Sequence, residues 1–356
     1  MSKIELRKKA IPKDRKDDTL PQDYVVWDDD MVSAANVALV LGKPLLLTGD
    51  PGVGKSEFSR WLAYEMELGE PESFVVKSTT EANDLFYRFD ALGRFHDAQI
   101  SVGSNPLQSP AVSAGTTKLR STLDYISYEA LGRAILYSQG REYAESKGLI
   151  NASMDPGFLQ RFPQKPRRSV VLIDEIDKAQ RDVPNDILDE IDKMVFTARE
   201  IGNQLISAAN EMRPIVVITS NSERDLPEPF LRRCVYYDIA FPTEDGVLEQ
   251  IVQSRLGDRM ASNCPLVEQA LQMLKYLRSG EITLDHKPGT AELLDWLYEL
   301  SVDRRDLAVT LANHPRGRIA ACATLFKHKK DQQQATERAW KQWLERSQNV
   351  STDSET

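Results

Sequence analysis

Eight consecutive residues carry the clearest chemical signal in the chain. They are Gly49, Asp50, Pro51, Gly52, Val53, Gly54, Lys55 and Ser56. Glycines at this spacing let backbone N–H groups curl around phosphates, and a helix that begins there favours their negative charge. Lys55 is expected to reach the β- and γ-phosphates, and the Ser56 hydroxyl to ligate Mg²⁺. A glycine-rich turn without a ligand is the alternative, which the apolar stretch before and the helical pattern after the loop disfavour.

A pair of carboxylates follows a second apolar stretch. Residues 170–173 are all apolar, and Asp174 and Glu175 come directly after them. Alternation along a strand would direct the two carboxylates to opposite sides, which suits two roles. Asp174 would hold the Mg²⁺ shell, and Glu175 would orient and polarise the water that attacks the γ-phosphate. Taken alone, acidic residues at a strand end are common helix caps; together with the phosphate loop they predict ATP hydrolysis.

Two further positions could contact the same phosphates. Asn221 follows the apolar stretch 214–219, at the strand edge where open α/β sheets bind ligands; a turn residue bonded to its own backbone is the alternative. Arg232 and Arg233 follow residues 226–230. Arginine stabilises charge on a transferring phosphoryl group and can do so from a neighbouring subunit, whereas the plainer interpretation is a surface pair on a short helix.

A sheet is needed to bring these residues together. Short apolar runs alternate with helical patterns up to Pro242, which indicates a parallel sheet covered on both faces, hence an α/β fold. We expect Asp30 or Ser33 to cap the first helix. Strands are expected at 44–48, 74–78, 170–173 and 214–219, helices at 31–41, 56–67, 125–146 and 183–196, and loops at 101–118 and 152–168.

Beyond Pro242 the pattern is helical only. The helices expected there are 244–255, 265–278, 290–302 and 317–327, followed by a polar helix to about residue 346 and a disordered tail.

Bulk composition limits the function classes. The net charge of −9 argues against a protein that coats nucleic acid, although residues 1–16 are locally basic. Three widely spaced cysteines suggest reduced thiols in the cytoplasm, and the four histidines show no zinc-ligand spacing. We see neither a signal peptide nor an apolar run of the ~20 residues that a membrane helix needs.

In this order the segments resemble AAA+ ATPases, and specifically their MoxR-like group. The likeness is carried by Pro44–Ser56, by Val170–Ala179, by 185–191 with 195–200, by Asn221 as sensor 1, by Leu226–Cys234 and by Lys287–Trp296. The resemblance implies an AAA+ P-loop domain, with its sheet between helices, followed by a small all-helical lid domain. Arg233 falls on the arginine finger, with Arg232 as the alternative.

The implied organisation has four parts. They are a flexible arm at 1–23, the αβ domain at 24–242 with an insertion at about 85–165, the lid at 243–330, and a C-terminal helix and tail at 331–356. The insertion accounts for the long separation of Lys55 from Asp174. Where related lids place a sensor 2 arginine, this chain has Ala291, and Arg316 is the alternative contact for the nucleotide.

The resemblance also implies a mechanism of action. ATP would lie between the αβ domain and the lid, and Arg233 of the next subunit would complete the site in a ring, most often a hexamer. Without a guanine-selective N-K-x-D motif, ATP is preferred over GTP. The expected client is a protein that is remodelled or matured, beside a von Willebrand A-type partner. The alternatives are the ATPase subunit of a nucleic-acid-acting or defence complex, and a non-hydrolysing switch, which the presence of both Lys55 and Glu175 disfavours.

Overall fold

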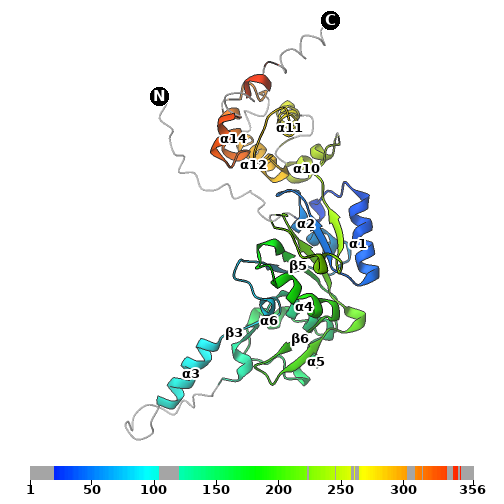
Figure 1. The fold of residues 1–356 in the computed structure, drawn as a ribbon, viewed down its shortest axis with the longest axis vertical. Coiled ribbons are helices and arrows are strands. Elements are labelled where there is room, and N and C mark those ends of the chain that lie inside the picture. Colours follow the sequence, from blue (N-terminus) through cyan, green and yellow to red (C-terminus); the bar gives the residue numbers. More distant parts are fainter. Residues whose placement is uncertain are drawn as a thin grey trace. The chain divides into compact units, whose positions relative to one another are not determined.

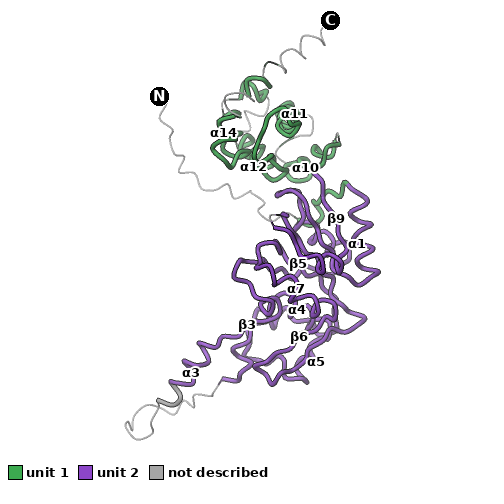
Figure 2. Tube along the Cα trace, viewed as in Figure 1, with its two compact units in different colours: residues 1–27, 242–356 green, residues 28–241 purple. Residues whose placement is uncertain are grey.

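The structure, a computed structural model, divides into two compact units (Figure 2). One unit comprises residues 28–241, and the other comprises 1–27 with 242–356, so that 24–27, expected in the αβ domain, group with the helical unit. The basic arm at 1–16, most of the loop expected at 101–118 and the tail from 346 lie outside the described residues. The residues described are 20–103 (side chains only to 99), 120–222, 224–244, 246–257, 260, 264–302, 309–314, 316–334, 340–343 and 345.

A parallel sheet forms the centre of the 28–241 unit (Figure 1). Its order is β2-β5-β8-β1-β9, and every neighbouring pair is parallel. The strands are β1 (Leu45–Thr48), β2 (Glu72–Val75), β5 (Val170–Asp174), β8 (Ile215–Thr219) and β9 (Val235–Asp238). The central strands β1 and β8 are buried along their whole length, as parallel strands covered on both faces are. The α/β fold expected from the sequence is confirmed.

Three helices pack against this sheet. Helix α1 (Asp29–Leu41) lies against β1 and β9, α2 (Lys55–Glu65) against β5 and β8, and α4 (Ala130–Gln139) against β2 and β5. Asp28 caps α1 by accepting a hydrogen bond from the Asp30 N–H. The prediction of Asp30 or Ser33 as the cap was therefore wrong, because the helix begins two residues earlier than expected.

The segment between β2 and β5 forms a second layer of small elements. Strands β3 (Tyr87–Phe89) and β4 (Ile126–Tyr128) pair antiparallel, and α3 (Ala91–Gly103) lies between them in the sequence. Helices α5 (Arg141–Ser146) and α6 (Pro156–Arg161) follow α4, and β6 (Val195–Ala198) pairs with β7 (Gln204–Ser207) in a hairpin. An aromatic cluster joins the insertion to this hairpin: Phe86, Tyr87, Tyr128 and Phe158 with Phe196.

Four expectations for this region were wrong in detail. Helix α3 continues to Gly103, so the loop expected from residue 101 starts later. Residues 152–168 contain α6, because Asp155 caps it and Pro156 stands at a position where no N–H is needed. The helix expected at 125–146 is a strand and two helices, broken at Gly140. The helix expected at 183–196, leading into a short strand, is two short ones, α7 (Val183–Asp186) and α8 (Leu188–Lys193), and the expected strand follows as β6.

The second unit is helical. Its helices include α10 (Val247–Leu256), α11 (Pro265–Arg278), α12 (Thr290–Leu300), α13 (Gly317–Thr324) and α14 (Lys329–Gln334), and residues 340–343 are helical as well. Trp296 of α12 is fully buried at its core. The short helix η1 (Pro21–Asp23) joins this unit through a hydrogen bond from the Ser254 hydroxyl to the Asp23 carbonyl. No helix among the described residues has the length and apolarity to cross a membrane.

Candidate functional site

The phosphate loop lies between the end of β1 and the start of α2. Gly49 has a φ of 132°, and a Cβ there would lie 2.4 Å from the carbonyl oxygen of Ile239, which follows β9. A side chain at this position would therefore both strain the backbone and push β9 away. The loop ends at Gly54, so α2 begins at Lys55 and directs its first N–H groups into the loop.

Lys55 extends back into the loop that precedes it. Its ammonium donates hydrogen bonds to the carbonyl oxygens of Gly49 at 2.8 Å and Asp50 at 3.0 Å. Burial lowers its pKa, while the nearby carboxylates of Asp174 and Asp177 act in the opposite direction. A buried cation held by carbonyl dipoles suits a phosphate ligand, because an anion would offset the cost of burying the charge.

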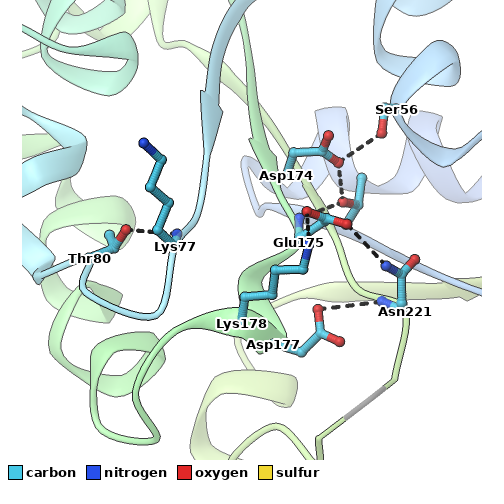
Figure 3. Close-up of polar contacts among 9 residues, drawn as sticks. Ser56, Lys77, Thr80, Asp174, Glu175, Asp177, Lys178 and Asn221 are labelled. Atoms are coloured by element: carbon cyan, nitrogen blue, oxygen red, sulfur yellow. Dashed lines mark hydrogen bonds and ion pairs between the residues drawn. The ribbon is translucent and has the colours of Figure 1, made fainter.

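Asp174, the last residue of β5, is linked by hydrogen bonds to α2 and to β8 (Figure 3). Its Oδ1 accepts hydrogen bonds from the Ser56 hydroxyl at 2.7 Å and the Thr219 hydroxyl at 2.5 Å. Strand β8 lies between β1 and β5, which places Thr219 next to Asp174. The two predicted metal ligands, Ser56 and Asp174, therefore meet as a pair of oxygen donors. Such a pair fits Mg²⁺, which proteins commonly hold by few side-chain oxygens together with substrate phosphates.

Glu175 adopts a left-handed backbone conformation just past the end of β5, with φ 60° and ψ 51°. Strand alternation, the reason given from the sequence for its direction, therefore does not apply. Its N–H donates to the Thr219 hydroxyl at 2.9 Å. The Glu175 carboxylate accepts a hydrogen bond from the Asn221 side-chain amide at 3.3 Å on Oε1 and forms an ion pair with Lys178 at 2.5 Å on Oε2 (Figure 3).

Asn221 is brought beside Glu175 as its sequence position suggested. Its backbone N–H donates to the Asp177 carboxylate at 3.4 Å, and Asp177 is buried in the short helix η4 (Ile176–Lys178). The sequence did not single out Thr219 or Lys178. Lys178 had one local signal, since residues three apart on a helical turn face each other.

Arg233 lies at the amino edge of the sheet, where the strands begin, whereas the phosphate loop lies at the carboxyl edge, where they end. Arg233 precedes β9, whose first residue Val235 is in register with Leu45, whereas the phosphate loop follows the last residue of β1. Its guanidinium forms an ion pair with Asp192 at 3.3 Å and is 44% exposed. Arg232, the alternative, pairs with Glu228 at 3.1 Å. Within its own unit, Arg233 is thus not brought together with the loop or with Glu175.

Arg316 belongs to the helical unit. Its guanidinium donates to the Glu299 carboxylate at 2.5 Å and to the Glu299 carbonyl at 3.2 Å. Ala291, at the position expected for a sensor 2 residue, is exposed on α12.

Comparison with known proteins identifies the larger unit. The family model of the AAA domain (dynein-related subfamily) matches residues 44–234, more than half of the chain. The chain belongs to this AAA family. Proteins with an AAA domain are in general ATPases that bind ATP or ADP, and they usually assemble into rings.

Two other comparisons add little to this AAA assignment. No curated protein matches the chain significantly. Among solved structures, the crystal structure of the FIGL-1 AAA domain in complex with ADP aligns with 92% of this chain and 89% of its own, at 16% identity and a TM-score of 0.43.

Proposed function

We propose that this AAA protein hydrolyses ATP at the contacts between subunits of a homo-oligomeric ring and uses the motion to remodel or mature a protein partner. A MoxR-like identity, a hexameric ring and a von Willebrand A-type partner are part of the proposal and come from the sequence resemblance. One observation carries the subunit contact: Glu175 and the phosphate loop meet at the carboxyl edge of the sheet, while Arg233 lies exposed at the amino edge.

The groups at the carboxyl edge have separate roles in this proposal. The loop N–H groups and Lys55 bind the phosphates, and Ser56 and Asp174 would hold Mg²⁺. Mg²⁺, when bound, supplies positive charge to the phosphate oxygens. Glu175 polarises the attacking water, and Asn221, which already donates to the Glu175 carboxylate, positions that water. ATP is the proposed nucleotide because no guanine-selective motif follows the loop.

The roles assigned above leave one group to be supplied, a cation that faces the γ-phosphate from the side away from the phosphate loop. Transfer of the γ-phosphoryl spreads negative charge over its oxygens, which a guanidinium from a GTPase-type finger stabilises by a factor of about 10³–10⁵. Arg233 cannot supply this charge to its own subunit without crossing the sheet. Supplied by the next subunit, it makes activity depend on assembly, as in head-to-tail ring contacts.

The test is ATPase activity against protein concentration for wild type, for Arg233→Ala and for mixtures of the two. We expect specific activity of the wild type to rise with concentration and Arg233→Ala to lose about 10³-fold in kcat. In mixtures of wild type and Arg233→Ala, each loop is active when its neighbour supplies Arg233, whichever subunit carries the loop, so activity should fall in proportion to the wild-type fraction. Mixing Arg233→Ala with the loop variant Lys55→Ala should restore part of the activity, because the intact loop of the first can receive Arg233 from the second. Activity that is constant with concentration and indifferent to Arg233 would refute the shared site. Nucleotide binding by Arg233→Ala serves as the folding control.

A further inference from the structure

Helix α1 has an exposed apolar face at its C-terminal end. Val37, Val40 and Leu41 are 47%, 85% and 58% exposed. Their spacing of three and four residues places them on one side of the helix, while Met31, Ala35 and Ala38 are buried on the other. Packing of a helix on a sheet requires only that its buried face be apolar, so the exposed apolar face is not explained by the fold of this unit. A cluster of exposed apolar side chains on a folded surface marks a contact site.

The exposed α1 face adjoins the residues around Arg233. Directly after α1, the Lys43 ammonium donates to the Arg232 carbonyl at 3.4 Å, and the Pro44 carbonyl accepts from the Val235 N–H at 2.8 Å. A Cβ at Gly42 would lie 3.6 Å from the Arg213 side chain. Arg213 in turn donates to the Asp192 carbonyl at 2.8 Å, and Asp192 pairs with Arg233. The end of α1 and Arg233 thus belong to one continuous surface.

On the side of the sheet nearest α1, the two edges differ in charge, whereas β2 on the far side is an exception, because Glu70 and Glu72 stand at its start and Lys77 follows its end. Basic residues precede the strands at the amino edge: Lys43 before β1, Arg168 before β5, Arg213 before β8, and Arg232 with Arg233 before β9. Acidic residues end or follow the strands at the carboxyl edge: Asp50 after β1, Asp174, Glu175 and Asp177 at β5, and Asp238 at β9. A basic surface and an acidic surface on opposite edges of one unit are complementary in a head-to-tail contact, which is the kind that closes rings.

We infer that the exposed face of α1, formed by Val37, Val40 and Leu41, packs on the carboxyl edge of a second copy of this chain and seats Arg233 against that copy's phosphate loop. This inference rests on the proposed shared ATPase site and adds the surface that holds the subunits together. The apolar side chains supply burial, and the basic residues around them set the direction of the contact.

The exposed apolar residues of α3 provide a matched control. Leu92 is 82% exposed in the same unit, close to the value for Val40. It lies on a helix that is bound to η3 (Thr122–Tyr125) by the hydrogen bond from the Tyr125 hydroxyl to Asp97, away from the strand ends at Arg233. An aspartate adds the same charge at either position, but Val40 lies in the last turn of α1 and Leu92 in the first turn of α3, where the helix dipole acts on a carboxylate in opposite directions. Val40→Gln adds no charge and therefore separates the loss of the apolar contact from this effect.

The experiment compares Val40→Asp, Val40→Gln and Leu92→Asp with wild type. Assembly is measured by sedimentation velocity with ATP, in a Glu175→Gln background that does not consume the nucleotide. Turnover is measured against protein concentration for the same variants with Glu175 intact. We expect Val40→Asp to raise the concentration at half-maximal assembly and half-maximal activity by at least about tenfold, and Val40→Gln by less. The ATP affinity of the unassembled protein, measured at low protein concentration, should be unchanged in both, and Leu92→Asp should match wild type.

The outcomes separate this inference from the proposed function. Assembly of Val40→Asp at wild-type concentrations would overturn the inference, and so would equal loss in Val40→Asp and Leu92→Asp. The shared site would survive either result as long as Arg233→Ala remains assembled and inactive. Full activity of Arg233→Ala would instead refute the shared site itself. The unchanged ATP affinity of each variant shows that it is folded.

Discussion

At the scale of single residues, the Glu175 carboxylate is the group whose surroundings matter most. One oxygen accepts from Asn221 and the other is paired with Lys178, while the N–H of Glu175 is fixed by Thr219. Each carboxylate oxygen can accept two hydrogen bonds, so a water can still bind to Glu175. The positive charge of Lys178 nevertheless offsets part of the negative charge with which Glu175 would polarise that water, and Lys178 is 42% exposed, so its side chain can move away.

Lys178→Met should raise turnover. The substitution removes the ion pair but keeps the chain length, and a half-exposed ion pair contributes at most about 1 kcal/mol, so the expected increase in kcat is up to about fivefold. KM for ATP should stay the same, since the ion pair that is removed involves Glu175 and not the residues assigned to the phosphates. Lys178→Arg, which retains the pair, should behave as wild type. A loss of turnover in Lys178→Met would show that Lys178 acts on the nucleotide instead.

Cys234, next to Arg233, should react slowly with thiol reagents. Burial raises the pKa of its thiol from 9.0 to about 12, so at pH 8 the folded protein should hold about a thousandfold less thiolate than an ordinary cysteine. The folded state should accordingly lose stability as pH rises from about 9 to about 12, because the unfolded chain releases this proton first.

The measurement uses a Cys264→Ser/Cys322→Ser background, in which Cys234 is the remaining thiol. The rate of disulfide exchange with a chromogenic reagent should rise about tenfold per pH unit between pH 8 and 11. The same chain in denaturant gives the rate of an ordinary thiol. Equal rates in the folded and denatured protein at pH 8 would contradict the prediction.

At the scale of elements, one glycine sets how closely α4 packs. A Cβ at Gly132 would lie 1.9 Å from the Phe86 carbonyl oxygen, at the end of η2 (Ala82–Leu85). The Phe86 carbonyl also accepts from the Glu129 N–H at 2.9 Å, which ties the start of α4 to the backbone between η2 and β3. The aromatic side chains of the insertion therefore keep their contact with Phe196 only while α4 and this backbone remain together.

Gly132→Ala should destabilise the αβ unit by about 1–3 kcal/mol, because two backbones would have to move apart. The free energy of unfolding in urea measures the effect. Gly157→Ala is the control: its new Cβ would lie 3.1 Å from the side chain of Asp155, the cap of α6, which needs to move only slightly, and alanine favours the helix, so the loss should stay below about 1 kcal/mol. Equal stability of Gly132→Ala and wild type would mean that α4 is not packed as described.

The elements also show what a sequence reveals and what it does not. Lys55 and Asp174 could be assigned from the sequence because each belongs to a short contiguous motif whose neighbours set its conformation. The contact of Thr219 with Asp174 could not, since it depends on β8 lying between β1 and β5. The prolines after residue 152 favoured a loop, although Pro156 is compatible with the first turn of α6.

At the scale of the whole molecule, charge is organised by strand direction. The net charge of −9 is not spread evenly over the sheet: basic residues precede β1, β5, β8 and β9, and acidic residues end or follow β1, β5 and β9, whereas β2 begins with Glu72 and is followed by Lys77. A phosphate ligand adds negative charge at the acidic edge, which makes that edge a better surface for the basic edge of another copy. Nucleotide binding and subunit contact should therefore reinforce each other.

Salt should weaken this assembly. The screening length falls from about 10 Å at 0.1 M to about 3 Å at 1 M, so attraction between the two edges should fade while apolar contacts of α1 persist. At saturating ATP and constant Mg²⁺, the protein concentration that gives half-maximal ATPase activity should rise steadily with KCl. Arg232→Gln removes a cation that is 76% exposed and should flatten this dependence. Val40→Gln should shift the whole curve to higher protein concentration with its slope unchanged. A half-maximal concentration that does not move with salt would mean that the charge on the two edges does not guide subunit association.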